Sequence, residues 1–202
     1  MSRIFYIMGK SASGKDTIYK KLLERIPGLK TIIPYTTRPI RDGEVNGVEY
    51  FFTTREKLEQ FRREEKLIEE RTYETIYGPW SYFTVDDGQF DRMGHGTYLM
   101  IGTLESYEKT RDYFGNEYLY PIYVEVSDRE RLLRSIEREQ GQEFPKYKEV
   151  CRRFLADEED FKEENLLRCG IEVRFQNDDL ERCLDEIVNQ VKKSLKMEKG
   201  IE

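Results

Sequence analysis

Residues 9–17, with the sequence GKSASGKDT, decide the fold of this chain. They follow an apolar run at residues 4–8 that is short enough to be one buried strand. After them, Ile18, Leu22 and Leu23 recur at the spacing of one helical face. A strand, a glycine-containing turn and a helix form the context in which G-x-x-x-x-G-K predicts a phosphate-binding turn, or P-loop. The alternative is a glycine-containing turn that binds no ligand.

The chemistry of the turn suits a nucleotide triphosphate. Gly9 and Gly14 allow a tight bend in which successive backbone amides point at an anion, and the helix N-terminus adds further N–H donors. Lys15 supplies a point charge for the β and γ phosphates. Asp16 stands where a Mg²⁺-binding Ser or Thr is usual, and the hydroxyl comes one place later, at Thr17. Thr17 is therefore the expected Mg²⁺ ligand.

Composition limits the other classes of function. The 202 residues suffice for one α/β domain, and a net charge of −6 argues against binding of a nucleic-acid polymer. The three cysteines are widely spaced and form no CxxC pair, so neither a disulfide framework nor a zinc site is expected. We find no apolar run long enough for a membrane span and no signal peptide. We therefore expect a cytoplasmic protein with no membrane partner.

A second polar motif lies at residues 36–52, TTRPIRDGEVNGVEYFF. Arg38 and Arg41, three residues apart in a loop with Pro and Gly, suit bidentate capture of a phosphate. Tyr50 can add a hydroxyl donor to the same anion. Judged from these residues alone, the loop could equally be a charged surface turn.

The rest of the chain alternates strand and helix patterns, which favours a parallel sheet. Thr54 is a plausible N-cap for the helix that follows it, and Asp178 or Asp179 for the last helix. Ser127 opens another helix in the manner of a capping box. Helices are expected at residues 54–65, 85–93, 104–114, from 127 onward and at 178–197, with strands within 67–84, at 98–102 and at 119–126.

Arginines recur on the helix after Ser127. Arg131, Arg134 and Arg138 are spaced by three and four residues, and Arg152 and Arg153 follow on the next predicted helix. One interpretation is a salt-bridged surface. The other is a set of cations that stabilises a phosphoryl group in transfer, because the transition state spreads negative charge over its oxygens.

Together these motifs resemble the guanylate kinases. The pattern TTRPxRxGExxGxxYFF, some twenty residues beyond a P-loop, is similar to their nucleoside-monophosphate-binding segment, and NDDLE at residues 177–181 is similar to their final turn. The resemblance implies an α/β, three-layer P-loop NTPase fold with a central parallel sheet. It further implies one domain, 1–202, with a core (1–33, 96–130 and 165–197), a small β-rich acceptor-binding subdomain (about 34–90) and a helical lid (about 131–160).

The resemblance also implies the reaction, in which ATP with Mg²⁺ phosphorylates GMP, and small-molecule nucleotides as the partners of a monomer or homodimer. The implied catalytic residues are Lys15, Arg134, Arg138, Arg152 and Arg153. The implied ATP-binding residues are Gly9, Ser11, Ser13, Gly14, Lys15, Asp16, Thr17 and Asn177. The implied acceptor-binding residues are Arg38, Arg41, Tyr50, Glu69 and Tyr77. Glu69 suits guanine because its carboxylate can accept from the adjacent N1–H and N2 amine.

Several positions depart from the guanylate kinase pattern. Pro34 and Pro79 stand where the family usually has hydroxyl residues, and residues 99–104 lack the acidic DxDxxG segment. The sequence Gly-Lys-Asp-Thr at 14–17 is similar instead to ribose 1,5-bisphosphate phosphokinases, which are the alternative enzyme. A non-catalytic phosphopeptide-binding module of guanylate kinase type is a further alternative, although such modules typically have an eroded P-loop.

Overall fold

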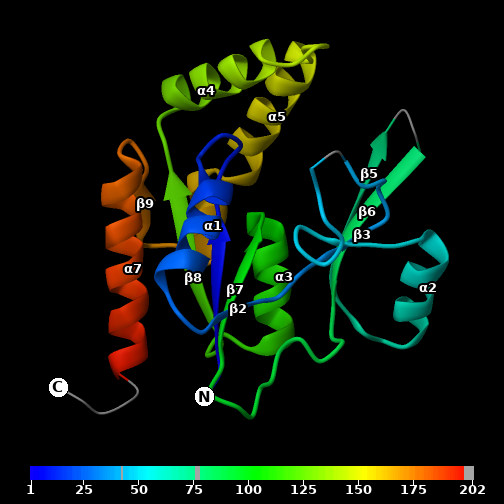
Figure 1. Cartoon of the computed structure of the whole chain (residues 1–202), viewed down its shortest axis with the longest axis vertical. Coiled ribbons are helices and arrows are strands. Elements are labelled where there is room, and N and C mark those ends of the chain that lie inside the picture. The colour runs from blue at the N-terminus through cyan, green and yellow to red at the C-terminus, as the bar shows by residue number, and fades with distance from the viewer. Residues whose placement is uncertain (42, 76–77, 198–202) are drawn as a thin grey trace.

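The computed structural model describes residues 1–41, 43–75 and 78–197, and its centre is a five-stranded sheet (Figure 1). The strand order is β2-β7-β1-β8-β9, and all neighbouring strands are parallel. All six residues of β1, the central strand, are buried because helices cover both faces of the sheet. The strands are β1 (Arg3–Met8), β2 (Leu29–Thr31), β7 (Thr97–Gly102), β8 (Leu119–Glu125) and β9 (Arg174–Gln176).

Helices cover both faces of this sheet and complete three layers. The side chains of β1 alternate between two separate cores: Phe5 and Ile7 pack with α1 (Lys15–Arg25) and α7 (Leu180–Met197). Tyr6 and its neighbours on the other face pack with α3 (Leu104–Phe114) and α6 (Glu163–Arg168). The predicted three-layer α/β fold is confirmed.

A second, four-stranded sheet lies to one side of the central sheet (Figure 1). Its order is β4-β3-β6-β5, and β5 and β6 form an antiparallel pair. Helix α2 (Arg55–Arg63) packs on it through Leu58 and Phe61. Thr54 caps α2 as predicted, because its side chain accepts a hydrogen bond from the backbone N–H of Lys57. The strands are β3 (Tyr35–Thr36), β4 (Phe51–Phe52), β5 (Leu67–Thr75) and β6 (Gly78–Val85).

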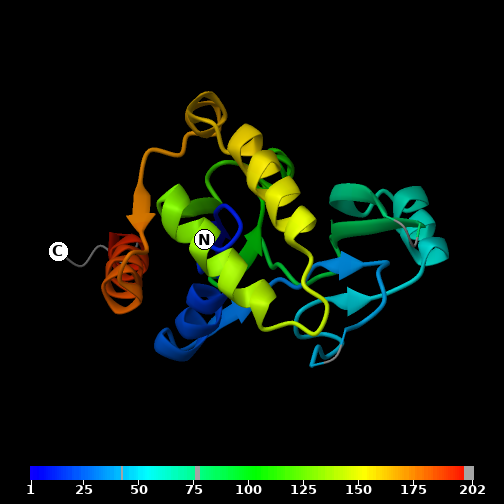
Figure 2. The same ribbon diagram turned by 90° about the horizontal axis from the view of Figure 1, so that it is seen from above.

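Two further helices, α4 (Asp128–Gln140) and α5 (Tyr147–Asp160), lie over the carboxyl ends of the central strands (Figures 1 and 2). Ser127 begins α4 by accepting from the backbone N–H of Glu130. Arg131 is buried between the two helices and forms ion pairs with carboxylates of both. Its guanidinium therefore fixes α4 against α5 and is not available for a substrate.

The prediction of a helix at residues 85–93 is wrong. Val85 ends β6, and the chain then forms bends and a turn. The carboxylate of Asp91 accepts hydrogen bonds from the backbone N–H groups of Met93 and Gly94. This local bonding gives the backbone an alternative to the helix. The other predicted helices and strands are present, and Asp179 caps α7 by accepting from the N–H of Arg182.

The cysteines occupy different environments. Cys151 is exposed on α5, whereas Cys169 and Cys183 are buried. Burial raises the pKa of the Cys183 thiol to about 11 and also raises the pKa of Cys169. Within the described ranges, every helix is too short or too polar to cross a lipid bilayer.

Candidate active site

The turn at residues 9–14 needs glycine at both ends. A β-carbon on Gly9 would lie 2.5 Å from the carbonyl oxygen of Val124, which belongs to the neighbouring strand and cannot move away. Gly14 has a φ of 86°, in the left-handed region, and its Cα is closely approached by the side chain of Asn177. These restraints bring the turn into a tight bend between β1 and α1.

Two predicted residues hold this turn from distant parts of the chain. Asn177 donates its side-chain N–H to the carbonyl oxygen of Ser13 at 2.8 Å, and Arg134 donates to the carbonyl oxygen of Asn177 at 3.0 Å. The guanidinium of Arg134 also bonds Glu130 at 3.1 Å. In the described part of the chain, the Ser13 hydroxyl oxygen is the one buried side-chain N or O atom without a hydrogen-bond partner.

The first turn of α1 carries Lys15, Asp16 and Thr17. The ammonium group of Lys15 lies 3.4 Å from the Asp16 carboxylate, and both Asp16 and Thr17 are exposed. Carboxylate and hydroxyl oxygens are the ligands that Mg²⁺ prefers. No cluster of three or more His, Cys, Asp or Glu able to hold a metal occurs in the described residues. The donor set thus fits a Mg²⁺ ion that depends mainly on nucleotide phosphates for its ligands.

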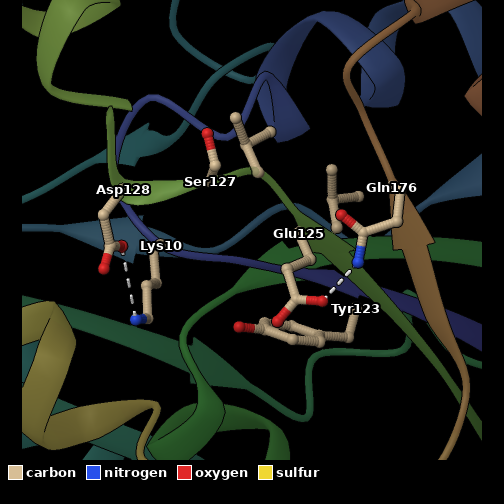
Figure 3. Close-up of a pocket in the computed structure, with 8 residues that line it drawn as sticks. Lys10, Tyr123, Glu125, Ser127, Asp128 and Gln176 are labelled. Atoms are coloured by element: carbon tan, nitrogen blue, oxygen red, sulfur yellow. Dashed lines mark hydrogen bonds and ion pairs between the residues drawn. The ribbon is translucent and has the colours of Figure 1, made fainter. Parts of the chain in front are cut away.

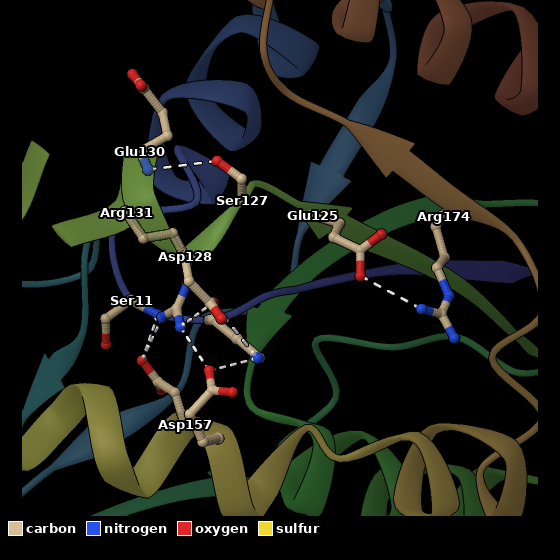
Figure 4. A network of polar contacts seen from close by, with 10 residues as sticks. Ser11, Glu125, Ser127, Asp128, Glu130, Arg131, Asp157 and Arg174 are labelled. Atoms are coloured by element: carbon tan, nitrogen blue, oxygen red, sulfur yellow. Dashed lines mark hydrogen bonds and ion pairs between the residues drawn. The ribbon is translucent and has the colours of Figure 1, made fainter. Parts of the chain in front are cut away.

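Carboxylates of α5 contact the same turn, an arrangement that the sequence did not predict. Asp157 accepts from the backbone N–H of Ser11 at 2.8 Å, and Glu158 accepts from the ammonium of Lys10 at 2.5 Å (Figure 4). Arg131 bonds both carboxylates, at 3.4 Å and 2.7 Å. The charge of Lys10 is thereby balanced by that of Glu158, and α5 is joined to the turn.

A pocket of about 280 Å³ lies behind this contact, at the end of β8 (Figure 3). Its polar lining includes Lys10, Glu125, Asp128 and Gln176. Two carboxylates accompany the one cation, and Lys10 already lies 3.9 Å from Asp128. This pocket is therefore a poor site for an anionic phosphate, unlike the turn itself.

The arginine loop is organised by Glu44. Arg38 is buried and donates to both carboxylate oxygens of Glu44, at 2.7 and 2.5 Å, while its guanidinium lies over the ring of Tyr50. The backbone N–H of Arg41 bonds the same carboxylate at 2.9 Å. The side chain of Arg41 is exposed, and it has no hydrogen bond or ion pair among the residues that the structure describes. Arg41 is thus the cation of this loop that an incoming anion can reach.

Tyr50 connects the loop to the first turn electrostatically. Burial raises the pKa of Tyr50 and Tyr82 raises it further, whereas the charges of Arg38 and Arg71 lower it; the charge of Asp16 adds a smaller upward contribution. A charge on α1 acts on Tyr50 only because the two lie in the same region of the molecule. The first turn of α1 and the arginine loop are therefore neighbours in the fold.

Glu69 lies where the small sheet meets the central layers. It is buried on β5 and accepts from the Thr84 hydroxyl at 2.8 Å and from Nε of Arg71 at 3.4 Å. Arg71 in turn donates to the hydroxyl of Thr103, the N-cap of α3, at 2.7 Å. Burial raises the pKa of Glu69, and the positive charge of Arg71 opposes this shift. Sequence reasoning missed Arg71, although its position two residues after Glu69 on one strand would have placed both on the same face.

Three further arginines of the predicted site are not joined to the turn. Arg152 and Arg153 both bond Glu149 on their own helix, at 2.8 Å. Arg138 is exposed on α4, and none of the described hydrogen bonds or ion pairs connects these three arginines to residues 9–17. Tyr77, the fifth predicted acceptor residue, lies outside the described residues.

Comparison with known proteins shows which family this chain resembles. Residues 1–85 match the guanylate kinase family model. The predicted resemblance to the guanylate kinases is confirmed for this part of the chain. The guanylate kinase of Oceanobacillus iheyensis is 41% identical over 90 residues, which cover 43% of this chain and 44% of that protein. That of Chlorobium luteolum is 35% identical over 101 residues, covering 50% and 49%.

The guanylate kinase of Anaplasma phagocytophilum has a similar fold, with a TM-score of 0.63 and 19% identity over 96% of this chain and 86% of that chain. The matched sequence segments span about half or less of the curated guanylate kinases. The family-model match includes the P-loop and the arginine loop but ends before α4 and Asn177. In the second half of the chain, the likeness to guanylate kinases is therefore one of fold.

Proposed function

We propose that this protein transfers the γ-phosphoryl group of ATP to GMP, giving ADP and GDP. The observation that carries the proposal is the match of residues 1–85 to the guanylate kinase family model. A phosphoryl transferase needs two anion sites that face each other across one phosphoryl group. The sequence similarity to guanylate kinases includes both loops.

The donor side would use the first turn. Backbone amides of residues 9–14 and the ammonium of Lys15 would bind the ATP phosphates, and Asn177 would border the adenine. Mg²⁺, held by Thr17 or Asp16 together with the phosphates, would neutralise charge on the β and γ oxygens. The contact of Asn177 with Ser13 supports a shared site.

The acceptor side would use the small sheet. Arg38, Arg41 and Tyr50 would bind the phosphate of GMP, with Tyr77 as a further ligand, and Glu69 would accept from the guanine edge. The burial of Glu69 supports a role in recognition, because a desolvated carboxylate discriminates strongly between bases that do and do not offer donors.

In this reaction the protein would form no covalent bond with the substrates. An acceptor phosphate oxygen, already anionic at neutral pH, forms a bond to the γ phosphorus while the bond to the β–γ bridging oxygen breaks and ADP leaves. Lys15, Arg134, Arg138, Arg152 and Arg153 would stabilise the equatorial charge. The last three would have to approach through movement of α4 and α5, which would also exclude water from the site.

The same proposal covers the organisation of the molecule. A single domain, 1–202, would combine the core (1–33, 96–130 and 165–197), the acceptor-binding subdomain (about 34–90) and the lid (about 131–160). It would act on small nucleotides in the cytoplasm, as a monomer or a homodimer.

The test is a coupled ADP-release assay with ATP, Mg²⁺ and a panel of acceptors: GMP, dGMP, AMP, UMP and ribose 1,5-bisphosphate. We expect the wild type to phosphorylate GMP. The Lys15→Ala variant should lose both this turnover and the binding of ATP. Turnover of another acceptor without turnover of GMP would refute the proposed substrate. ATP binding that is equally tight in Lys15→Ala, without turnover of any acceptor, would favour a non-catalytic module.

A further inference from the structure

Arg71 is a second charged group beside the predicted base reader. Glu69 and Arg71 are two residues apart on β5, and Nε of Arg71 lies 3.4 Å from the Glu69 carboxylate. Only 3% of the Glu69 side chain and 15% of the Arg71 side chain are exposed. A cation and an anion that are both this far removed from water form a polar pair with fixed geometry, unlike the mobile ion pairs of a surface.

The guanidinium of Arg71 is held in place by contacts that do not use all of its hydrogen-bond donors. Its Nη1 donates to Thr103 and its Nε faces Glu69, while Nη2 has no hydrogen-bond partner among the residues that the structure describes. The positive charge of Arg71 also opposes the rise in the pKa of Tyr50 that burial causes. Arg71 therefore contacts Glu69 and Thr103 and keeps one donor group, Nη2, with which it can bind a ligand.

The chemistry of guanine matches this pair. On one edge guanine offers two donors, N1–H and the N2 amine, and the acceptor O6 beside N1–H; the second acceptor, N7, lies on the other side of O6. A carboxylate can accept from the donors, and a guanidinium donates to O6 and N7 in the most common specific contact between a protein and guanine. Pro34 and Pro79 have no side-chain donors, so the acceptor oxygen of the base needs a donor from elsewhere.

We infer that Arg71 donates to O6 of the acceptor's purine while Glu69 accepts from N1–H, so that the two residues together select 6-oxopurine nucleotides. This inference rests on the proposed function and names the base that its acceptor site recognises. Adenine presents an amine where guanine has O6 and a lone pair where guanine has N1–H, so both contacts would be lost and two charged groups left unpaired.

The experiment measures binding of four nucleoside 5′-monophosphates by calorimetry without ATP. GMP has all the groups, IMP lacks the N2 amine, the 2-aminopurine nucleotide lacks O6 and N1–H, and AMP lacks O6, N1–H and N2. In Arg71→Gln we expect affinity for GMP and IMP to fall roughly 10- to 150-fold, the loss of one charge-assisted hydrogen bond. Affinity for AMP and the 2-aminopurine nucleotide should remain as weak as in the wild type.

Two variants serve as controls. Arg71→Lys keeps a positive donor and should recover part of the affinity for GMP and IMP alone. Arg62→Gln removes an exposed arginine of α2 that bonds Glu70, the neighbour of Glu69, and should leave all four affinities unchanged. Thermal unfolding of each variant checks that it folds. If Arg71→Gln does not fold, the affinities of Arg71→Lys are compared with those of the wild type instead.

The outcomes separate the two proposals. A loss of equal size for all four nucleotides would place Arg71 at the phosphate or in the framework and overturn the inference alone. Unchanged affinity for GMP and IMP in Arg71→Gln would also overturn it. Wild-type protein that binds no GMP and turns over none would refute the proposed function, and the base assignment with it.

Discussion

The backbone N–H of Ser11 donates to the carboxylate of Asp157 at 2.8 Å, across 146 residues of sequence. Ser11 lies in the turn that we expect to bind ATP, and Asp157 lies on α5, the second helix of the predicted lid. Arg131 beneath them bonds Asp157 as well. The position of α5 is therefore coupled directly to the backbone of the turn at residues 9–14.

Replacement of Asp157 by alanine should destabilise the fold. The Ser11 N–H and the buried Arg131 guanidinium would each lose an acceptor, and we expect the free energy of unfolding to fall by about 1–3 kcal/mol in urea denaturation. Asp157→Asn keeps an acceptor oxygen, so its free energy of unfolding should fall by less. Asp112→Ala, at an exposed carboxylate of α3, is the matched control. Equal stability of Asp157→Ala and this control would contradict the importance of the contact.

Gly9→Ala should disturb the turn itself. The new β-carbon would meet the backbone oxygen of Val124 at 2.5 Å and the Ser13 hydroxyl at 2.7 Å, so the turn must shift. We expect a loss of ATP affinity of at least roughly tenfold in a fluorescent-nucleotide titration, together with lower stability. Gly141→Ala is the control, because Gly141 has a φ of −76° and a β-carbon there would lie 3.6 Å from the carbonyl oxygen of Arg138, an ordinary van der Waals distance. ATP affinity that survives Gly9→Ala unchanged would argue against phosphate binding here.

Arg41→Ala should separate the two substrate sites. Its exposed guanidinium is available to the acceptor phosphate, so GMP affinity should fall by about 1.5–3 kcal/mol, the contribution of a charge-assisted hydrogen bond. ATP affinity should change little. Calorimetric titration with each nucleotide measures both effects. If the variant weakened the two nucleotides equally, Arg41 would have a general electrostatic role rather than the one assigned.

Glu69 should make stability depend on pH. Burial raises its pKa above the ordinary 4.5, so the folded state binds more protons than the unfolded state just above that pH. The contribution of Glu69 to stability is then present below pH 4.5 and is lost as the pH rises through its folded pKa. Urea unfolding of wild type and Glu69→Gln between pH 4 and pH 7 should show the wild type losing stability relative to the variant. A difference that stays constant over this range would refute the shift.

Local patterns were sufficient for the fold. The alternation of strand and helix periods, the P-loop and the Thr54 cap each depend on neighbours within a few residues, and all are present. The exception is residues 85–93, where the Asp91 side chain bonds the backbone and the helical pattern has no effect. Sequence periodicity does not reveal such competition, because it depends on one side-chain rotamer.

The site was predictable only in part. Motifs identified the loops around Lys15 and Arg41, but not the partners that residues choose across the fold. Arg38 donates its hydrogen bonds to Glu44, and the backbone N–H of Ser11 donates to Asp157. Nothing in either local sequence specifies these pairs. Arg71 was missed because it belongs to no motif, and its significance depends on burial against Thr103.

The exposure of Cys151 gives α5 a natural attachment point for a chemical reporter. Because the other two thiols are buried in the native state, a maleimide dye should modify this helix selectively, and no substitution is needed. The dye would then lie on the same helix as Asp157. Its emission would report, in real time, whether bound nucleotides weaken the contact between that helix and the turn.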